Sequence, residues 1–146
     1  MDVVGLNKNG IENVVANLGT SLTDKQILIL NQFFEDVIIC FDGDESGYKA
    51  ALRAAENSIK ELQPEKQISF LFLPDGEDPD SFSNKNGKDY FIDFTKQNKI
   101  SIYQFIFDHY RNQTENNPSS MAIFEKTLRS TAVSYTHLTL PTKRIV

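Results

Sequence analysis

The segment Val37-Ile38-Ile39-Cys40-Phe41-Asp42-Gly43-Asp44-Glu45-Ser46-Gly47 joins five apolar residues directly to a short acidic sequence, DGDESG. The run VIICF is continuously apolar and rich in β-branched residues, which is typical of a parallel strand covered on both faces. Three carboxylates within four residues at the end of a buried strand repel one another unless a positive charge lies among them. The segment therefore predicts a strand that ends at a site for a cation.

A second unit of the same kind comes next along the chain. Residues 45–62 have apolar side chains at helical spacing, and Pro64 stands where such a helix must end. The next apolar run, residues 67–73, predicts a second strand, and it too leads into acids in PDGEDPDS. Strands that alternate with helices predict an α/β sheet with right-handed crossovers.

The rest of the chain gives weaker signals. Thr23 and Gln26 form a capping-box pattern that predicts a helix running to about Phe34. The remaining expectations are a short helix in 1–10 closed by Gly10, a strand over 14–16, a loop at SNKNGKD (83–89) and helices from Lys88 onward. Residues 131–146 show no clean period, and we expect them to be an extension that is foreign to the fold.

Composition narrows the classes of protein. With 146 residues and 40% hydrophobic side chains, the chain can form one core with a small appendage. Cys40 is the single cysteine, which argues against a disulfide framework or a cysteine-based zinc site. No apolar run approaches the roughly 18 residues of a membrane span, and the N-terminus lacks a signal-peptide pattern, so we expect a cytoplasmic protein with no membrane partner. The net charge of −5 argues against a general polynucleotide binder, unless the acids are concentrated at a metal site.

Acidic residues come directly after both predicted strands. If the strands are neighbours in a parallel sheet, their ends lie at the same edge, roughly 5–10 Å apart. Mg²⁺ prefers carboxylate oxygens, water and substrate phosphates, and two such ions suit phosphoryl transfer. Plainer interpretations remain open, namely a polar turn in which Asp44 caps the next helix, a solvated acidic loop, and an ordinary exposed face for Lys49 and Arg53. The second cluster consists of Asp75, Glu77, Asp78 and Asp80.

Other chemistries match less well. DGDESG imitates the start of an EF-hand loop, but the twelfth position is Arg53 instead of Glu, and the preceding segment is a predicted strand. A haloacid-dehalogenase-type phosphatase also places D-x-D after a strand, yet it expects Thr or Val soon after the second Asp. Catalysis by a nucleophilic Ser or Cys lacks a histidine placed to act as base.

Three longer stretches carry a family resemblance. CFDGDESGYKAALRA resembles the D-x-D-x-x-G segment of the Toprim fold, which primases, topoisomerases and some nucleases share. FLFLPDGEDPDSF resembles the form of this region in bacterial DnaG-type DNA primases, and MDVVGLNKNGIENVVANLGTSLTDKQ is similar to the stretch after the family's Glu-Gly-Tyr-Met-Asp motif. The resemblance runs from Met1 to about Tyr110, so the chain is identified as a member of these primases.

The resemblance implies a fold and a site. It implies a doubly wound α/β Toprim domain over 1–98, a mostly parallel sheet with helices on both faces, the start of a helical subdomain over 99–130, and a tail over 131–146. The implied activity of the intact parent is synthesis of short RNA primers by nucleotidyl transfer with Mg²⁺ or Mn²⁺, in two ions. By motif, the implied metal ligands and catalytic residues are Asp42, Asp44, Asp78 and Asp80, and those expected near nucleotide phosphates are Gly43, Gly47 and Lys49.

The sequence also departs from the family pattern. The Glu of the Glu-Gly-Tyr-Met-Asp motif would precede Met1, and its strand is expected to be absent with it. The zinc module, the basic subdomain and the helicase-binding domain are missing too, so we expect this chain alone to be inactive. Single-stranded DNA template, ribonucleoside triphosphates and a replicative helicase are then partners of the intact parent. A fragment of another Toprim enzyme, or a non-catalytic metal- or phosphate-binding module, stays as an alternative.

Overall fold

A computed structural model describes residues 2–17, 22–59, 65–114, 122 and 126 of the chain. The contacts divide the chain into two compact units, Met1–Phe105 and Ile106–Val146. The expected tail over 131–146 lies outside the described residues, and so do Pro64 and the last residues of the helix expected over 45–62. None of the helices in the described part of the chain combines the length and the hydropathy that crossing a bilayer requires.

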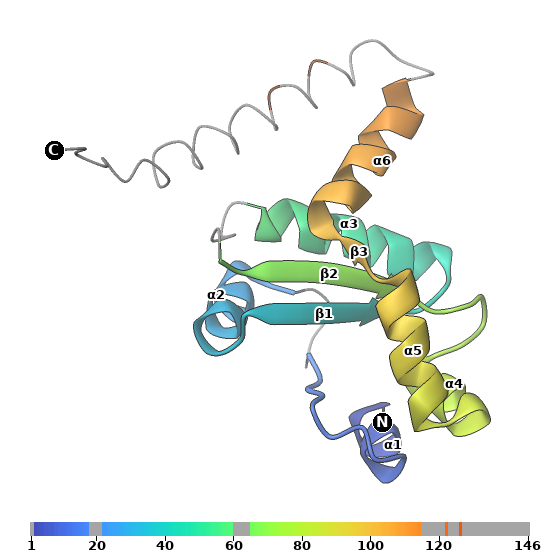
Figure 1. Cartoon of the computed structure of the whole chain (residues 1–146). Helices are drawn as coiled ribbons and strands as arrows, with labels where there is room; N and C mark the ends of the chain where they lie inside the picture. The colour runs from blue at the N-terminus through green and yellow to red at the C-terminus, as the bar shows by residue number, and fades with distance from the viewer. Residues whose placement is uncertain (1, 18–21, 60–64, 115–121, 123–125, 127–146) are drawn as a thin grey trace, which may run out of the picture. The chain divides into compact units, whose positions relative to one another are not determined.

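Helices and strands alternate from α2 to α4, as the sequence predicts for the two strand–helix units (Figure 1). The Thr23 capping box is present, with the Gln26 N–H 3.4 Å from Thr23 Oγ1 and the Gln26 side chain turned back to the Thr23 backbone. The elements in chain order are α1 Asp2–Lys8, α2 Asp24–Phe33, β1 Asp36–Phe41, α3 Glu45–Ser58, β2 Gln67–Phe72, α4 Pro79–Asn86, α5 Lys88–Asn98, β3 Ile100–Ser101 and α6 Ile102–Thr114.

The described sheet has the strand order β1-β2-β3. β1 and β2 run parallel along their whole length, with Asp36 level with Gln67 and Phe41 level with Phe72. β3 is only two residues long and pairs antiparallel with β2, Ser101 opposite Ser69. The central strand β2 is therefore hydrogen-bonded on both edges, which explains why four consecutive residues of it are buried.

One face of the sheet carries an aromatic cluster. Side chains two residues apart on a strand share a face, so Phe70 and Phe72 lie together, and Phe41 joins them from β1. The Tyr48 ring of α3 and the Phe105 ring of α6 pack over them, with centroids 5.2 Å apart from each other, and Phe105 is also 5.2 Å from Phe70. This layer packs α3 and the start of α6 onto the sheet.

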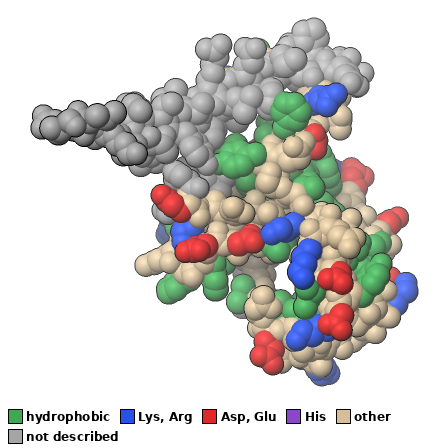
Figure 2. Space-filling view, in the orientation of Figure 1, with side chains coloured by type: hydrophobic (Ala, Val, Ile, Leu, Met, Phe, Trp, Pro, Cys, Tyr) green, Lys and Arg blue, Asp and Glu red, His purple; other side chains and the backbone are tan. Residues whose placement is uncertain are grey.

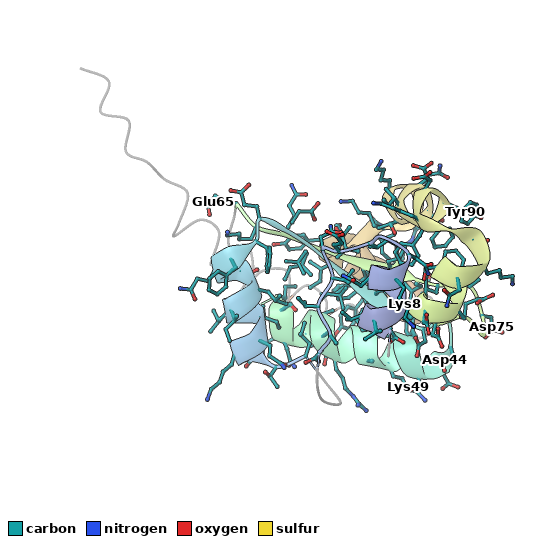
Figure 3. All side chains as sticks on the ribbon, turned by 90° about the horizontal axis from the view of Figure 1, so that it is seen from below. Lys8, Asp44, Lys49, Glu65, Asp75 and Tyr90 are labelled. Atoms are coloured by element: carbon teal, nitrogen blue, oxygen red, sulfur yellow. The ribbon has the colours of Figure 1, made fainter. Side chains whose placement is uncertain are left out.

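The opposite face holds a second core. Leu71 and Leu73, which alternate with the phenylalanines of β2, are 1% and 3% exposed. They pack with residues of α1, α4 and α5 and of the segment after α1, which are Leu6, Ile11, Phe82 and Phe91. Helices thus cover both faces of the sheet, which confirms the predicted architecture (Figure 3).

Two expectations about strands are wrong. β1 was expected to be fully covered on both faces, but none of its residues is fully buried and Ile38 is 38% exposed. Residues 14–16 form no strand. Val14 packs against the core of α1 and α4, whereas Val15 is exposed, so this β-branched run contributes one apolar contact without a pairing partner.

The expected loop at SNKNGKD is also wrong, because α4 continues to Asn86 and α5 begins at Lys88. Asp78 and Ser81 form a capping box, Pro79 stands at the first helical position, and the buried Phe82 anchors the helix. Gly87, at φ +83°, is the single residue between the two helices. Ser83 of this stretch is buried, whereas Asn84, Lys85 and Asn86 lie on the exposed side of α4, so most of the polar residues that indicated a loop belong to a helix surface.

Charged side chains of both signs intermingle on the face shown in Figure 2. Ion pairs in the first unit include Lys99 with Asp36 at 3.0 Å and Lys85 with Glu77 at 2.8 Å. Such exposed pairs contribute little to stability, on the order of 0–1 kcal/mol each. The main stabilisation of the fold therefore comes from the apolar layers, one on each face of β2.

Replacing Leu71 by Ala should test whether the buried apolar layers stabilise the fold. Because Leu71 is 1% exposed, the substitution leaves a cavity and should lower the free energy of unfolding by about 2–5 kcal/mol. Leu28→Ala deletes the same atoms from a residue that is 45% exposed and should cost less than about 1 kcal/mol. Urea unfolding followed by circular dichroism measures both, and equal losses would contradict the assignment of Leu71 to the core.

Candidate metal centre at the ends of the parallel strands

The turn after β1 packs directly on the turn after β2. A Cβ on Gly43 would collide with the carbonyl of Leu73 and the backbone of Pro74, and a Cβ on Gly47 would collide with the Asp42 carbonyl. Both glycines are therefore required by the close approach of the chain's own backbone. Their expected role in admitting nucleotide phosphates stays a prediction.

Asp44 and Asp78 occupy equivalent positions, each at the start of the helix that follows a parallel strand. Asp44 is the N-cap of α3, and its Oδ1 accepts a hydrogen bond from the Gly47 N–H at 2.6 Å. Asp78 is the N-cap of α4, and its Oδ1 accepts from the Ser81 N–H at 2.7 Å. Each carboxylate thus accepts a hydrogen bond from an otherwise unpaired N–H at a helix N-terminus, and the positive end of the helix dipole stabilises its negative charge. The plain interpretation of Asp44 as a cap is geometrically correct, and it leaves the second carboxylate oxygen available.

Asp42 stands at the electrostatic centre of this edge. Burial raises the pKa of its carboxyl above the usual range, and the carboxylates of Asp44, Asp2 and Asp78 raise it further. No cation or hydrogen-bond donor within the described residues offsets these effects for Asp42. Asp2, Asp44 and Asp78 thus lie close enough to Asp42 to disfavour its charged form, as the parallel arrangement predicts for Asp44 and Asp78.

Asp2 is the acid that sequence reasoning missed. It begins α1, forty residues before Asp42, and raises the pKa of both Asp42 and Cys40. The helix that carries Asp2 packs on α4. The apolar pattern of the strands, from which the site was predicted, gives no sign of this contact between two helices. The available signal was its position as the Asp that ends the Glu-Gly-Tyr-Met-Asp pattern.

The pKa of Cys40 is also affected by the negative charges of these acids. Its side chain lies on the sheet face that packs against α1 and α4. Burial, followed by the charges of Asp42 and Asp2, raises the pKa of the thiol to about 12. A thiol with this pKa stays protonated near neutral pH, so Cys40 acts as a small apolar residue below the acids.

The other acids of the second cluster separate into different roles. Glu77 accepts hydrogen bonds from Lys85 at 2.8 Å and Ser81 Oγ at 2.7 Å, and these hold the pKa of its carboxyl below the usual range. Asp80 accepts from Asn84 Nδ2 at 2.7 Å and lies against Gly5 of α1. Asp80 is not among the acids that raise the pKa of Asp42.

Lys49 lies on α3, at the same end of the molecule as Asp44 and Asp75 (Figure 3). Its ammonium is 2.6 Å from the Glu45 carboxylate one turn before, and both side chains are largely exposed. A pair of this kind is easily exchanged for another anion. A contact between Lys49 and a phosphate therefore stays a prediction.

The donor chemistry of this edge fits a hard divalent cation. Asp2, Asp42, Asp44 and Asp78 offer only carboxylate oxygens, the ligands that Mg²⁺ and Mn²⁺ prefer. Within the described residues, however, no three such side chains converge into a ready-made metal cage. The helix caps explain part of this, because each turns one carboxylate oxygen toward its own backbone. The edge is rich in carboxylates of the kind that bind hard cations, but in the described residues they do not form a closed cage.

Replacing Asp44 by Ala should remove the cap of α3. In the presence of a chelator, Asp44→Ala should lower the free energy of unfolding by about 1 kcal/mol. Asp44→Asn keeps a capping oxygen and should stay within a few tenths of a kcal/mol of the parent, on the order expected for exchange between good caps. Urea unfolding compares the three proteins, and an Asp44→Ala variant as stable as Asp44→Asn would contradict the capping role.

Replacing Asp42 by Asn should have the opposite sign. Because the folded state raises the pKa of Asp42, ionisation of this group opposes folding at neutral pH. Asp42→Asn should therefore be more stable than the parent at pH 7 without metal. The gain should stay below about 1 kcal/mol, since solvent screens a largely exposed group.

The pH dependence has the same physical origin. As the pH falls toward about 4, the ordinary value of an Asp carboxyl, the parent regains the lost stability and the two unfolding curves should converge. Unfolding by urea at several pH values between about 7.5 and 4 measures this. A stability advantage of Asp42→Asn that grows on acidification would refute the repulsion at Asp42.

Comparison with known proteins agrees with this geometry. The profile of the Toprim domain family matches residues 1–72. The DNA primase of Pasteurella multocida is 46% identical over 107 residues, which is 73% of this chain and 18% of that protein. The chain thus spans about a fifth of the length of this relative.

Solved structures of primases superpose on the chain. A DNA primase domain from Pseudomonas aeruginosa has a TM-score of 0.75 and 39% identity, over 77% of this chain and 35% of that one. The catalytic domain of a DnaG primase bound to single-stranded DNA has a TM-score of 0.77 and 37% identity, over 86% of this chain and 40% of that one. Sequence, fold and the acidic ends of the parallel strands therefore agree that this chain belongs to the bacterial DnaG-type DNA primases and contains their Toprim region.

Proposed function

We propose that this chain is the metal-holding part of a primase that makes short RNA primers on single-stranded DNA by nucleotidyl transfer during replication. The observation that supports the proposal is the parallel pairing of β1 and β2, which ends both strands at one edge of the sheet, where Asp44 and Asp78 raise the pKa of Asp42. A match to primases at 46% identity supports the same conclusion. It also favours a primase over a Toprim nuclease, a topoisomerase or a non-catalytic binding module.

The metal would be Mg²⁺ or Mn²⁺, in two ions. Asp42, Asp44 and Asp78 are the proposed ligands, with Asp80 completing the cluster and Asp2 adding charge from α1. When bound, divalent ions stabilise the charge that develops on phosphate and activate the attacking hydroxyl. The support in this chain is the uncompensated repulsion at Asp42, which a divalent cation would relieve.

The remaining roles belong to the chain's own residues. The caps of α3 and α4 hold Asp44 and Asp78 in place before a cation arrives, which lowers the ordering cost of binding. Gly43 and Gly47 keep the turn flat enough for a nucleotide phosphate to approach, and Lys49 would exchange Glu45 for that phosphate. In this arrangement the side chains orient the triphosphate at an edge that is open to water.

The partners are inferred from the relatives. A DnaG primase domain of similar fold binds single-stranded DNA, which supports the same template here. Ribonucleoside triphosphates as substrates, a replicative helicase as partner and the cytoplasm as location belong to the proposal for the whole protein. Since the chain spans 18% of the length of its Pasteurella relative, we expect it to make no primers alone.

A chimera tests the proposal. The 107 residues of the Pasteurella multocida primase that align with this chain are replaced by the corresponding residues of this chain. The chimera should synthesise primers on single-stranded DNA with Mg²⁺. Asp42→Asn in the chimera should reduce the rate by about 100-fold or more, because a ligand of the catalytic metal is lost while the fold is not weakened.

Asp75→Asn supplies the matched control. Asp75 is an exposed acid of the second cluster that does not raise the pKa of Asp42, and its loss should change the rate by less than about threefold. Equal losses of rate in the two variants would mean that the overall negative charge of the edge, and not metal binding by Asp42, determines the rate. A chimera that keeps full activity when it carries Asp42→Asn would disprove the assignment of the site.

A further inference from the structure

A polar network joins the end of α1 to the beginning of α4. Asn9 lies just after α1, and its Nδ2 donates to Ser83 Oγ at 3.0 Å and to Asn84 Oδ1 at 2.8 Å. Asn84 in turn donates from Nδ2 to Asp80 Oδ1 at 2.7 Å. These bonds connect residues more than seventy positions apart in the sequence and end at one acid of the candidate site.

The direction of this network is determined by its last member. An ionised carboxylate only accepts hydrogen bonds, so the Asn84 amide must present its Nδ2 to Asp80. Its Oδ1 then faces Asn9, which must present Nδ2 in return. Both amides therefore have one orientation each, and a flip of either would place two donors or two acceptors together.

A second branch reaches the same residue through the backbone. Ser83 is fully buried, accepts from Asn9, and donates from Oγ to the Asp80 carbonyl at 3.1 Å. Asn9 is thus connected to both the backbone and the carboxylate of Asp80. A residue held at both points has little freedom to rotate, even though Asn84 itself is exposed.

The packing of α1 adds a steric limit. Gly5 lies against the Asp80 side chain so closely that a Cβ there would overlap the carboxylate. The backbone of α1 and the Asn84 amide therefore both lie against the same carboxylate oxygen, Oδ1, and together they limit its positions. The oxygen Oδ2 is the part of Asp80 that this arrangement leaves for another ligand.

We infer that Asn9 and Asn84 are positioning residues that hold the Asp80 carboxylate for metal binding. The inference deepens the proposed function and rests on it, since it takes Asp80 as a member of the metal site. It also gives the α1 region a role in the site beyond the charge of Asp2, because Asn9, the residue just after this helix, bonds to Asn84 and through it acts on Asp80.

Titration of Mn²⁺ into the 146-residue chain, monitored by electron paramagnetic resonance, tests the inference. Asn84→Ala should weaken Mn²⁺ binding by about tenfold, the size of effect seen when a residue that orients a ligand is removed. Asn9→Ala should weaken it in the same direction. In an Asp80→Ala background, Asn84→Ala should have no further effect, which a general loss of stability would not reproduce.

Asn86 offers a matched control on the same helix. Its Nδ2 donates to the Phe82 carbonyl at 2.9 Å, the same four-residue spacing as Asn84 to Asp80, but to the backbone instead of an acid. Asn86→Ala should leave Mn²⁺ binding within about twofold of the parent. Equal weakening by Asn84→Ala and Asn86→Ala would overturn the positioning role.

The outcomes separate the inference from the proposed function. If Asp42→Asn weakens Mn²⁺ binding and Asn84→Ala does not, the positioning role is wrong and the metal site stands. If Asp42→Asn has no effect, the proposed site fails, and the network is judged without metal. Asp80→Ala should then shift the side-chain amide signals of Asn84 and Asn9 in nuclear magnetic resonance spectra and leave that of Asn86 in place. Unchanged Asn84 signals would overturn the network itself.

Discussion

The parallel register of β1 and β2 is the constraint on which the rest of the site depends. With Phe41 level with Phe72, the two strands end at the same height, and the turns after them must share the same edge of the sheet. The contact is so close that the Gly43 backbone touches the Leu73 carbonyl. Acids at matching points of the two turns, such as Asp42 and Asp78, therefore lie close enough to repel each other.

The two helices that leave this edge moderate that repulsion in part. Each begins with an Asp as its cap, so two of the four carboxylates gain a backbone hydrogen bond and a favourable helix dipole where they would otherwise only repel. Asp42 has no such compensation in the described structure, and the pKa of its carboxyl is raised as a result. The repulsion is concentrated on one residue while its neighbours are anchored.

Much of this arrangement could be predicted because it depends on local patterns. The apolar runs of β1 and β2 and the acids after them predict adjacent carboxylates as soon as the strands are parallel, and Thr23 and Gln26 predict the start of α2. The parts that failed depend on tertiary partners. Residues 14–16 would form a strand only if a neighbouring strand were available for pairing. The position of Asp2 depends on the packing of α1 on α4 through Gly5 and Asn9. The polar composition of the second half of α4 led to the prediction of a loop, although Asp78, Pro79 and Ser81 form a capping pattern that indicates a helix.

Capping alone cannot explain why this edge is acidic. A cap at residue 44 or 78 needs an oxygen that accepts a backbone hydrogen bond, which Ser, Thr or Asn supplies as well as Asp. A charge at Asp42 has no capping role and opposes folding, because burial and three neighbouring carboxylates raise its pKa. The structural requirements of the turn thus account for polar residues at two positions, and they leave the charge itself unexplained. The proposed divalent cation would account for that excess charge, and this is the argument for a chemical role of this edge beyond a turn between strand and helix.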